Sequence, residues 1–151
     1  MIILERTFRL TREQHKTHAR DSFEVEPGTK KLFVDFRFSP AVVDDRSLLA
    51  RKFEEEASVF PPMKRKMFES YFLEAGRTLM NMVTLTLSGP GGFVGCAHNQ
   101  GDRPVIVISE EQSSPGFFRG APAAGTWVVT VSAFSVYSDA EAVLRIEGAA
   151  S

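Results

Sequence analysis

Hydrophobic and polar residues alternate along residues 1–39 in the manner of β-strands. The clearest case is KKLFVDFRF, in which one set of alternate positions is entirely apolar: Leu32, Val34, Phe36 and Phe38. Because successive side chains of a strand point to opposite faces, this set should face a core. ILERTFRLT (residues 3–11) and SFEVEP (residues 22–27) carry shorter versions of the pattern, and Pro27 and Gly28 mark a turn.

The period of the pattern changes between residues 44 and 76. Apolar side chains there recur at helical spacing, with charges between them: Leu49, Phe53, Ala57 and Phe60. Asp45 is suited to cap the N-terminus of this helix, and Pro61 and Pro62 end it. Pro62 can also begin a second helix, MKRKMFESYFLEA, which Gly76 would end. We therefore predict a pair of helices inserted between strands at about residues 44–76.

Residues 79–147 return to strand patterns. Four stretches have the character of strands: LMNMVTLTLSG, RPVIVISEE, GTWVVTVSAFSVYS and AEAVLRIEG. Glycine and proline clusters separate them, at residues 89–92, 115–116 and 122–125. Several short strands with this punctuation are typical of an antiparallel sandwich. The predicted fold class is therefore mainly β, an antiparallel β-sandwich or jelly roll with a helical-pair insertion, forming one domain over residues 1–151.

The glycine-rich stretch that follows the first of these strands, SGPGGFVG, raises the question of a phosphate site. A phosphate-binding loop needs G-x-x-x-x-G-K-[ST] leading into a helix, so that backbone N–H groups and the lysine hold the phosphate. No lysine follows here, and the next element is the apolar strand around Val105–Ile108. We interpret the cluster as a turn that brings Phe93 and the segment from Gly95 to His98 back toward the sandwich.

Three histidines are the candidate metal ligands. His15 and His18 form H-x-x-H, and His98 stands apart. Residues three apart share one face of a helix but point to opposite faces of a strand. With Asp21 nearby, a divalent-metal site at these histidines is the enzymatic alternative, in which the protein is a metal-dependent hydrolase. Solvated or edge-strand histidines fit the sequence better, so we predict no cofactor and no metal.

Other catalytic groups are not evident in the sequence. No G-x-S-x-G motif occurs, and Cys96 lacks a neighbouring motif that would activate it. The carboxylate runs Glu54–Glu56 and Glu110–Glu111 fit solvated surfaces rather than an acid–base pair. We therefore predict no catalytic residues and favour a protein that is not an enzyme.

The second predicted helix carries more apolar residues than one buried face needs: Met63, Met67, Phe68, Tyr71 and Phe72. Such a band fits an interface with a protein partner, including a second copy of the chain in a homodimer. It equally fits a helix that covers a sheet of its own domain. The sequence leaves these two interpretations open.

A small-ligand or carbohydrate site is a further alternative, with Phe117, Phe118 and Arg119 as its candidate residues in a loop between strands. Sugars pack on flat exposed aromatic side chains, but the chain has one Trp and two Tyr. Trp127 alternates in phase with Val129, so we expect it to face the core.

The overall composition narrows the range of partners. The formal net charge of −1 gives no electrostatic basis for binding nucleic acid or an anionic membrane. A single cysteine excludes an intrachain disulfide. The opening MIILERTFRL lacks the apolar region of a secretion signal, and no stretch is long enough to predict a membrane-spanning helix. We therefore predict a cytoplasmic protein that binds neither nucleic acid nor membrane.

The C-terminal half resembles the non-catalytic β-sandwich domain found at the N-terminus of metallohydrolases of the polymerase-and-histidinol-phosphatase (PHP) superfamily, in the carbaryl-hydrolase-like group. The matching positions lie in one run of motifs: Asn81, Thr84, Leu85, Leu87, Gly92-Phe93, Gly95, His98, Ile108-Ser109, Pro115-Gly116-Phe117, Gly120 and Gly125-Thr126-Trp127. The resemblance covers roughly residues 20–147, and its distinctive part follows residue 79.

What this resemblance implies is a fold and an accessory role. In that family the chemistry belongs to a PHP domain further along the chain, whose metal ligands begin with H-x-H, and this sequence holds no such motif. Family members carry Arg after the Gly-Phe pair, where this chain has Val94. The expected function is therefore a non-catalytic accessory or interaction module that mediates protein assembly or ligand binding.

Overall fold

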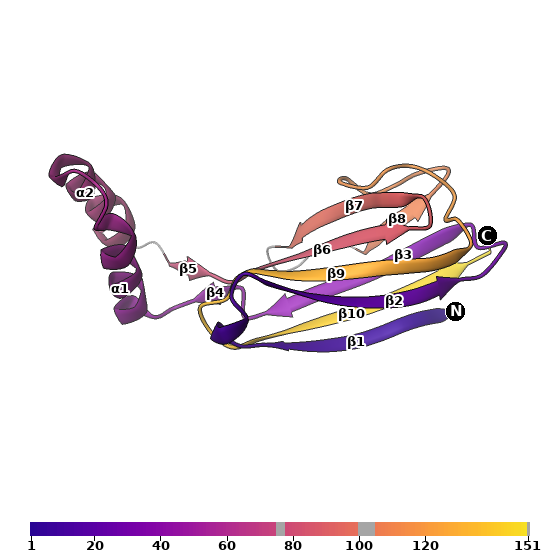
Figure 1. Ribbon diagram of the computed structural model, residues 1–151, viewed down its shortest axis with the longest axis horizontal. Coiled ribbons are helices and arrows are strands. Elements are labelled where there is room, and N and C mark those ends of the chain that lie inside the picture. Colours follow the sequence, from indigo (N-terminus) through magenta and orange to yellow (C-terminus); the bar gives the residue numbers. More distant parts are fainter. Residues whose placement is uncertain (75–77, 100–104, 151) are drawn as a thin grey trace. The chain divides into compact units, whose positions relative to one another are not determined.

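The computed structural model describes residues 1–74, 78–99 and 105–150, and it is mainly β with an inserted pair of helices (Figure 1). Two compact units divide the chain. The first comprises Met1–Ala41 and Asn81–Ser151, and the second comprises Val42–Met80. The first unit holds an antiparallel β-sandwich, so the predicted fold class is confirmed.

The sandwich consists of two four-stranded antiparallel sheets. The first sheet has the order β1 (Ile2–Leu10), β10 (Ala140–Ala149), β3 (Lys31–Ser39) and β8 (Ile106–Ser109). The second has the order β2 (Thr17–Val25), β9 (Gly125–Ser135), β6 (Met82–Gly89) and β7 (Gly92–Asn99), and it faces the viewer in Figure 1. A short 3-10 helix, η1 (Arg12–Gln14), connects β1 to β2. Consecutive strands thus often lie in different sheets, as a sandwich requires.

The core lies between the inner faces of these two sheets. In β3 the buried residues are those that the alternation predicts: Leu32, Val34, Phe36 and Phe38. They pack in one cluster with inward residues of the other sheet, including Leu85, Val129 and Val131. Trp127 is buried in the same cluster, as predicted, and its indole N–H donates to the carbonyl of Ala123 at 2.8 Å.

Asn81 divides the stretch that the sequence presents as one strand. β5 (Leu79–Met80) and β6 (Met82–Gly89) lie on either side of it, and its side chain is buried. The side-chain amide donates to the carbonyl of Pro40, and its oxygen accepts the backbone N–H of Tyr137 at 2.8 Å. Its own N–H donates to the carbonyl of Ala41 at 2.8 Å. Because buried polar groups need partners, this residue ties three chain segments together where the insertion begins and ends.

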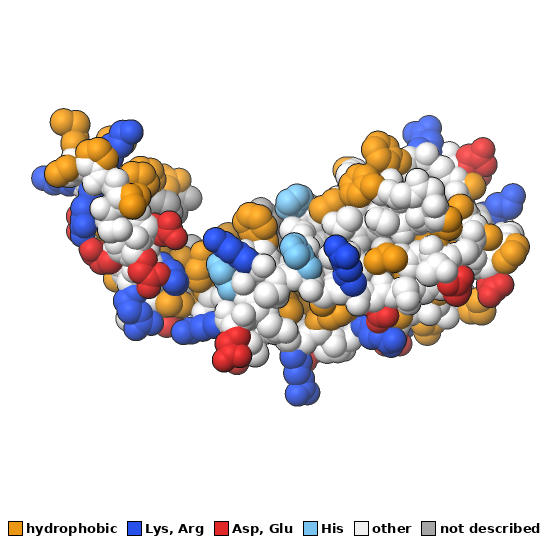
Figure 2. Space-filling view, in the orientation of Figure 1, with side chains coloured by type: hydrophobic (Ala, Val, Ile, Leu, Met, Phe, Trp, Pro, Cys, Tyr) orange, Lys and Arg blue, Asp and Glu red, His pale blue; other side chains and the backbone are white. Residues whose placement is uncertain are grey.

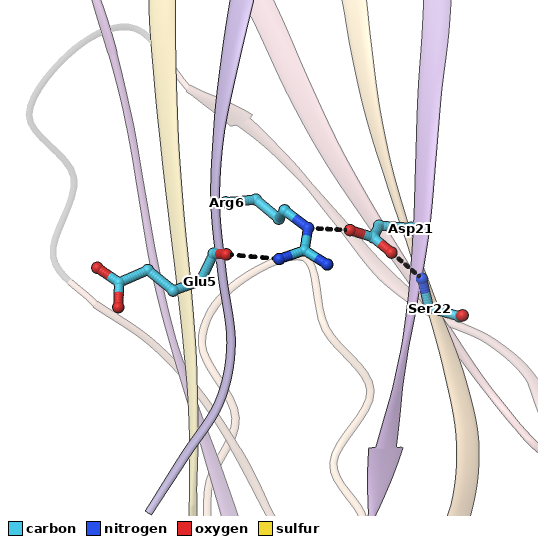
Figure 3. A network of polar contacts seen from close by, with 4 residues as sticks. All are labelled: Glu5, Arg6, Asp21 and Ser22. Atoms are coloured by element: carbon cyan, nitrogen blue, oxygen red, sulfur yellow. Dashed lines mark hydrogen bonds and ion pairs between the residues drawn. The ribbon is translucent and has the colours of Figure 1, made fainter.

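An ion pair lies at the open edge of the sandwich, where β1 and β2 run side by side as the end strands of the two sheets (Figure 3). Arg6 Nε donates to Asp21 Oδ2 at 2.5 Å, and Arg6 Nη1 donates to the carbonyl of Glu5 at 3.0 Å. Asp21 Oδ1 accepts the backbone N–H of Ser22 at 2.8 Å. Arg6 and Asp21 occupy positions in phase with inward apolar residues, Leu4 on β1 and Phe23 on β2. Charges in such positions keep strand edges from pairing with other chains.

The second unit consists of a two-stranded ribbon and the predicted helical pair. β4 (Val42–Val43) pairs with β5, and between them lie α1 (Arg46–Ala57), α2 (Pro62–Glu69) and a π-helical turn, η2 (Ser70–Glu74). The predicted helix end at Gly76 lies outside the described residues. Helix α1 ends before Phe60, which the spacing had included, because a residue that precedes proline is disfavoured in helical conformation and Pro61 follows it.

Asp45 caps α1, as the sequence predicts. Its carboxylate accepts the backbone N–H of Leu48 at 2.9 Å and the hydroxyl of Ser47 at 2.7 Å. These two hydrogen bonds, chiefly that from Leu48, hold the pKa of Asp45 below its ordinary value of 3.8. Because the pKa of Asp45 is lower in the folded state, the stabilisation of α1 by this cap is fully present above the ordinary pKa of 3.8. That stabilisation is lost as the pH falls through the lowered pKa of the folded state.

Candidate interaction surfaces

An exposed apolar stripe runs along α2 and η2. Met63, Met67 and Tyr71 are spaced four residues apart, and their exposed fractions are 82%, 70% and 49%. Residues at this spacing lie on one helix face. We call these three residues the Met–Tyr stripe; Figure 2 shows apolar side chains in orange on the helical pair.

The helical unit buries a different set of apolar side chains. Its buried apolar side chains come from β4 and α1: Val43, Leu48, Leu49, Phe53 and Ala57. Phe68 of α2 is half-buried, and its ring stacks on that of Phe60 with centroids 4.9 Å apart. Of the five predicted partner-binding residues, the structure therefore places Met63, Met67 and Tyr71 on one exposed face and turns Phe68 toward the helix connection. The side chain of Phe72 lies outside the described residues.

Charged side chains accompany the stripe. Lys64 and Lys66 are exposed on α2, one to each side of Met63 and Met67 in helical projection, and Glu69 is exposed one turn after Lys66. Arg65 instead forms an ion pair with Glu54 of α1, and Lys52 pairs with Glu55 within α1. The surface of α2 is thus an apolar stripe flanked by two lysines, with Glu69 on the face that points away from the stripe.

A second candidate surface is a groove of about 230 Å³ at one end of the sandwich. The turn between β6 and β7 forms one wall, and the segment from Phe118 to Ala123 forms the other. Phe93 and Phe118 stand on it with exposed fractions of 57% and 67%, and their rings meet edge to face with centroids 6.0 Å apart. Arg119 also lines the groove and is exposed.

Two glycines hold the Phe118 segment against β7. A Cβ at Gly95 would lie 2.3 Å from Phe117 Cδ1, and one at Gly116, whose φ is +92°, would lie 2.5 Å from the carbonyl oxygen of Cys96. Because neither glycine has a Cβ, the two backbones come close enough to hydrogen bond. The N–H of Cys96 donates to the carbonyl of Gly116 at 3.0 Å, and the N–H of Phe118 donates to the carbonyl of Val94 at 2.9 Å. The close approach of two backbones thus fixes the position of the exposed ring of Phe118.

The predicted ligand residues separate in the structure. Phe118 and Arg119 line the groove, but Phe117 is buried in the sandwich core. Phe93, on the opposite wall, was not among the predicted ligand residues. The sequence signal for Phe93 was a large aromatic side chain directly after a tight turn. Alternation did not indicate whether Phe93 or Val94 faces the core.

Two of the three histidines lie on the second sheet, and His15 lies in the connection between η1 and β2. His18 on β2 and His98 on β7 lie in the same row across the sheet. Ser132 on β9 and Thr84 on β6 occupy the two positions between them. Three strand spacings of about 4.8 Å put His18 and His98 roughly 14 Å apart, too far to share a metal ion. His15 Nδ1 accepts the backbone N–H of Val136 at 3.1 Å, and His18 Nδ1 lies 2.8 Å from the Ser132 hydroxyl.

Metal-ligating groups do not gather elsewhere in the described ranges. Among those residues no group of three or more His, Cys, Asp or Glu side chains is placed to hold a metal ion. Cys96 is half-buried on β7, opposite Thr86. Likewise, none of the described helices combines the length and apolar character needed to cross a membrane.

Comparison with known proteins found no matching family model and no matching curated protein. The protein is a β-sandwich with a helical-pair insertion, and it presents an apolar stripe on the insertion and an aromatic groove on the sandwich.

Proposed function

We propose that this protein is a non-catalytic interaction module that assembles with a second copy of itself through the Met–Tyr stripe. Its role would be comparable to that of the accessory β-sandwich domain of PHP metallohydrolases, which the sequence resembles. The observation that carries the proposal is the exposure of Met63, Met67 and Tyr71 on one face of α2 and η2. Large apolar side chains in one row favour association, because burying each from water stabilises a complex by about 1.5–3 kcal/mol.

The order of residues along the stripe suits pairing with itself. In a two-fold symmetric dimer a residue on the axis meets its own copy, and any other residue i that contacts residue j of the second copy is matched by a contact of j with i. If two α2 helices run antiparallel with the axis at Met67, Met67 meets its own copy and Met63 meets Tyr71 of the second copy. The stripe then forms a continuous apolar seam between the two helices.

Charged side chains stay off the seam in this arrangement. At about 100° per residue, Lys64 and Lys66 lie one to each side of Met63 and Met67, and Glu69 lies about 160° from Met67, on the far face of the helix. The stripe alone therefore supplies the contact between the two helices.

Cysteine crosslinking tests this arrangement directly. In a Cys96→Ser background, Met67→Cys should form an intermolecular disulfide under mild oxidation, because a residue on the two-fold axis lies beside its own copy. Glu56→Cys, on the exposed surface of α1, is the matched control and should stay monomeric on non-reducing gels.

Light scattering after size-exclusion chromatography tests the energetics. The wild type should run at twice its chain mass of 16.8 kDa, and Met67→Glu with Tyr71→Glu should run as a folded monomer with an unchanged circular dichroism spectrum. A wild type that is monomeric at tens of micromolar, or a dimer that survives both glutamates, would contradict the proposal. Loss of the folded state in the double variant would show that the stripe is part of a core.

A further inference from the structure

The groove on the sandwich has features of a built site, and it is independent of the Met–Tyr stripe. Phe93 comes from β7, and Phe118 comes from the segment that hydrogen bonds to β7 through Val94. Both rings are more than half exposed, yet each is held in place by backbone pairing. Two large aromatic rings fixed side by side in water present a preorganised apolar surface for a ligand.

Two glycines of the groove lining have open space where a side chain would begin. Gly91 and Gly120 both line it, and a Cβ built at either would meet no atom within 4 Å. Neither residue has a positive φ, so the backbone requires glycine at neither position. This differs from Gly89, where a Cβ would lie 3.0 Å from the Trp127 ring on the floor of the groove. A Cβ at position 120, on the groove lining, would therefore displace none of the protein's own atoms.

The lining fixes the chemistry that the groove would recognise. Apart from Arg119, the described lining residues are glycine, proline or apolar, and the Trp127 N–H is already bonded to Ala123. Within that lining no carboxylate faces Arg119. A carbohydrate needs several side-chain hydrogen bonds, which this surface does not offer, whereas an aromatic carboxylate needs one cation beside an apolar platform.

We propose that the groove between Phe93 and Phe118 binds a small aromatic carboxylate, with the rings packed against the ligand's ring and Arg119 paired with its carboxylate. The volume of about 230 Å³ lies below the range of sites for drug-sized ligands, so one or two fused rings are the suitable size. An open groove of this kind binds in the millimolar to high micromolar range.

The test is a titration of the full chain with 2-naphthoate, monitored by the chemical shifts of backbone amides and of the tryptophan indole N–H in NMR spectra. Its uncharged isostere 2-naphthamide is the ligand control. Trp127 is the only tryptophan, so its indole N–H gives one resonance on the groove floor. We expect saturable shifts of that resonance and of Phe93, Phe118 and Gly120, and binding of naphthamide about tenfold weaker because a charge-assisted hydrogen bond is lost.

Three variants locate the effect. Arg119→Gln should reduce naphthoate binding to the level of naphthamide, and Gly120→Val should abolish binding of both by adding a branched side chain to the groove lining. Arg9→Gln, which removes an exposed arginine of β1 away from the groove lining, should change nothing. Absence of saturable shifts, equal binding of the two ligands, or binding that survives Gly120→Val would overturn the proposal. If Gly120→Val failed to fold, Arg119→Gln would decide the question alone.

Discussion

Gly95 is the single residue on which the geometry of the groove depends most. It lies in β7, where the segment containing Phe117 crosses so closely that any Cβ would overlap it. The sequence presents Gly95 as one of several glycines in a turn-rich stretch, and the structure distinguishes it from its neighbours. Gly92 serves the turn itself with φ of +107°, Gly95 serves close packing, and Gly91 serves neither.

We predict that Gly95→Ala lowers the free energy of unfolding by about 1–3 kcal/mol, the usual cost of forcing an extra carbon into a packed site. The new Cβ would lie 2.3 Å from Phe117 Cδ1 and 2.5 Å from the Gly116 carbonyl oxygen, so the segment must move away from β7. Gly91→Ala is the matched control and should be neutral or slightly stabilising. Urea unfolding of both variants measures the difference, and equal free energies would show that the segment is not held there.

Single residues also mark how far the sequence could predict the candidate sites. Alternation along a nine-residue or longer strand correctly turned Leu32 and Trp127 inward. Phe117 and Phe118 lie in an irregular segment with one isolated bridge to β7, so no run of alternating residues indicated which of the two rings faces the core. Phe93 pairs with Ser88 between the turn and a register shift that falls after Leu87, so alternation along β7 did not indicate which way its ring points.

At the scale of elements, β1 and β2 show how the sandwich protects its open edge. Both are long end strands, and unpaired edges of this kind invite pairing with other chains. The pair of Arg6 and Asp21 sits at inward-phase positions of these two strands. Because both side chains are partly exposed, the pair adds little to folding stability. Its value lies in making the edge unsuitable for a further strand.

We therefore predict that Arg6→Leu with Asp21→Leu changes the unfolding free energy by no more than about 1 kcal/mol but raises the aggregation rate markedly. The exchanged pair, Arg6→Asp with Asp21→Arg, should behave as the wild type. Replacing Asp35 and Arg37, which pair on the interior strand β3, with leucine controls for added apolar surface. Light scattering at a fixed temperature gives the rates, and equal aggregation of the edge and interior variants would refute edge protection.

The periodicity of the sequence predicted the character of the elements but not how they pair. β1 and β10 lie at opposite ends of the chain and pair over almost their whole length, and no local pattern carries that information. The same limit applies to the helical pair. Helical spacing indicated one wide apolar band on the second helix. The structure divides this band, because Phe68 packs on Phe60 while the Met–Tyr stripe is exposed.

At the scale of the whole molecule, the division into two units means that the sandwich should not need its insertion. The sandwich core cluster contains none of the described residues of Val42–Met80. The two residues that flank this segment already meet, because the N–H of Asn81 donates to the carbonyl of Ala41 at 2.8 Å. A domain with its own core and adjacent junction residues is expected to tolerate removal of the segment between them.

The last prediction is therefore that replacing Val42–Met80 with an Asn-Gly turn leaves a folded sandwich. Its midpoint of thermal unfolding should be unchanged or raised, because a two-residue connection costs less closure entropy than a long one. If the proposals above hold, the shortened protein is a monomer that still binds 2-naphthoate, since the stripe lies in the insertion and the groove in the sandwich. Thermal unfolding, light scattering and the NMR titration each report on one of these outcomes.

A shortened chain that fails to fold would show that the helical unit is part of the sandwich core, and a shortened chain that remains a dimer would place the self-association surface on the sandwich.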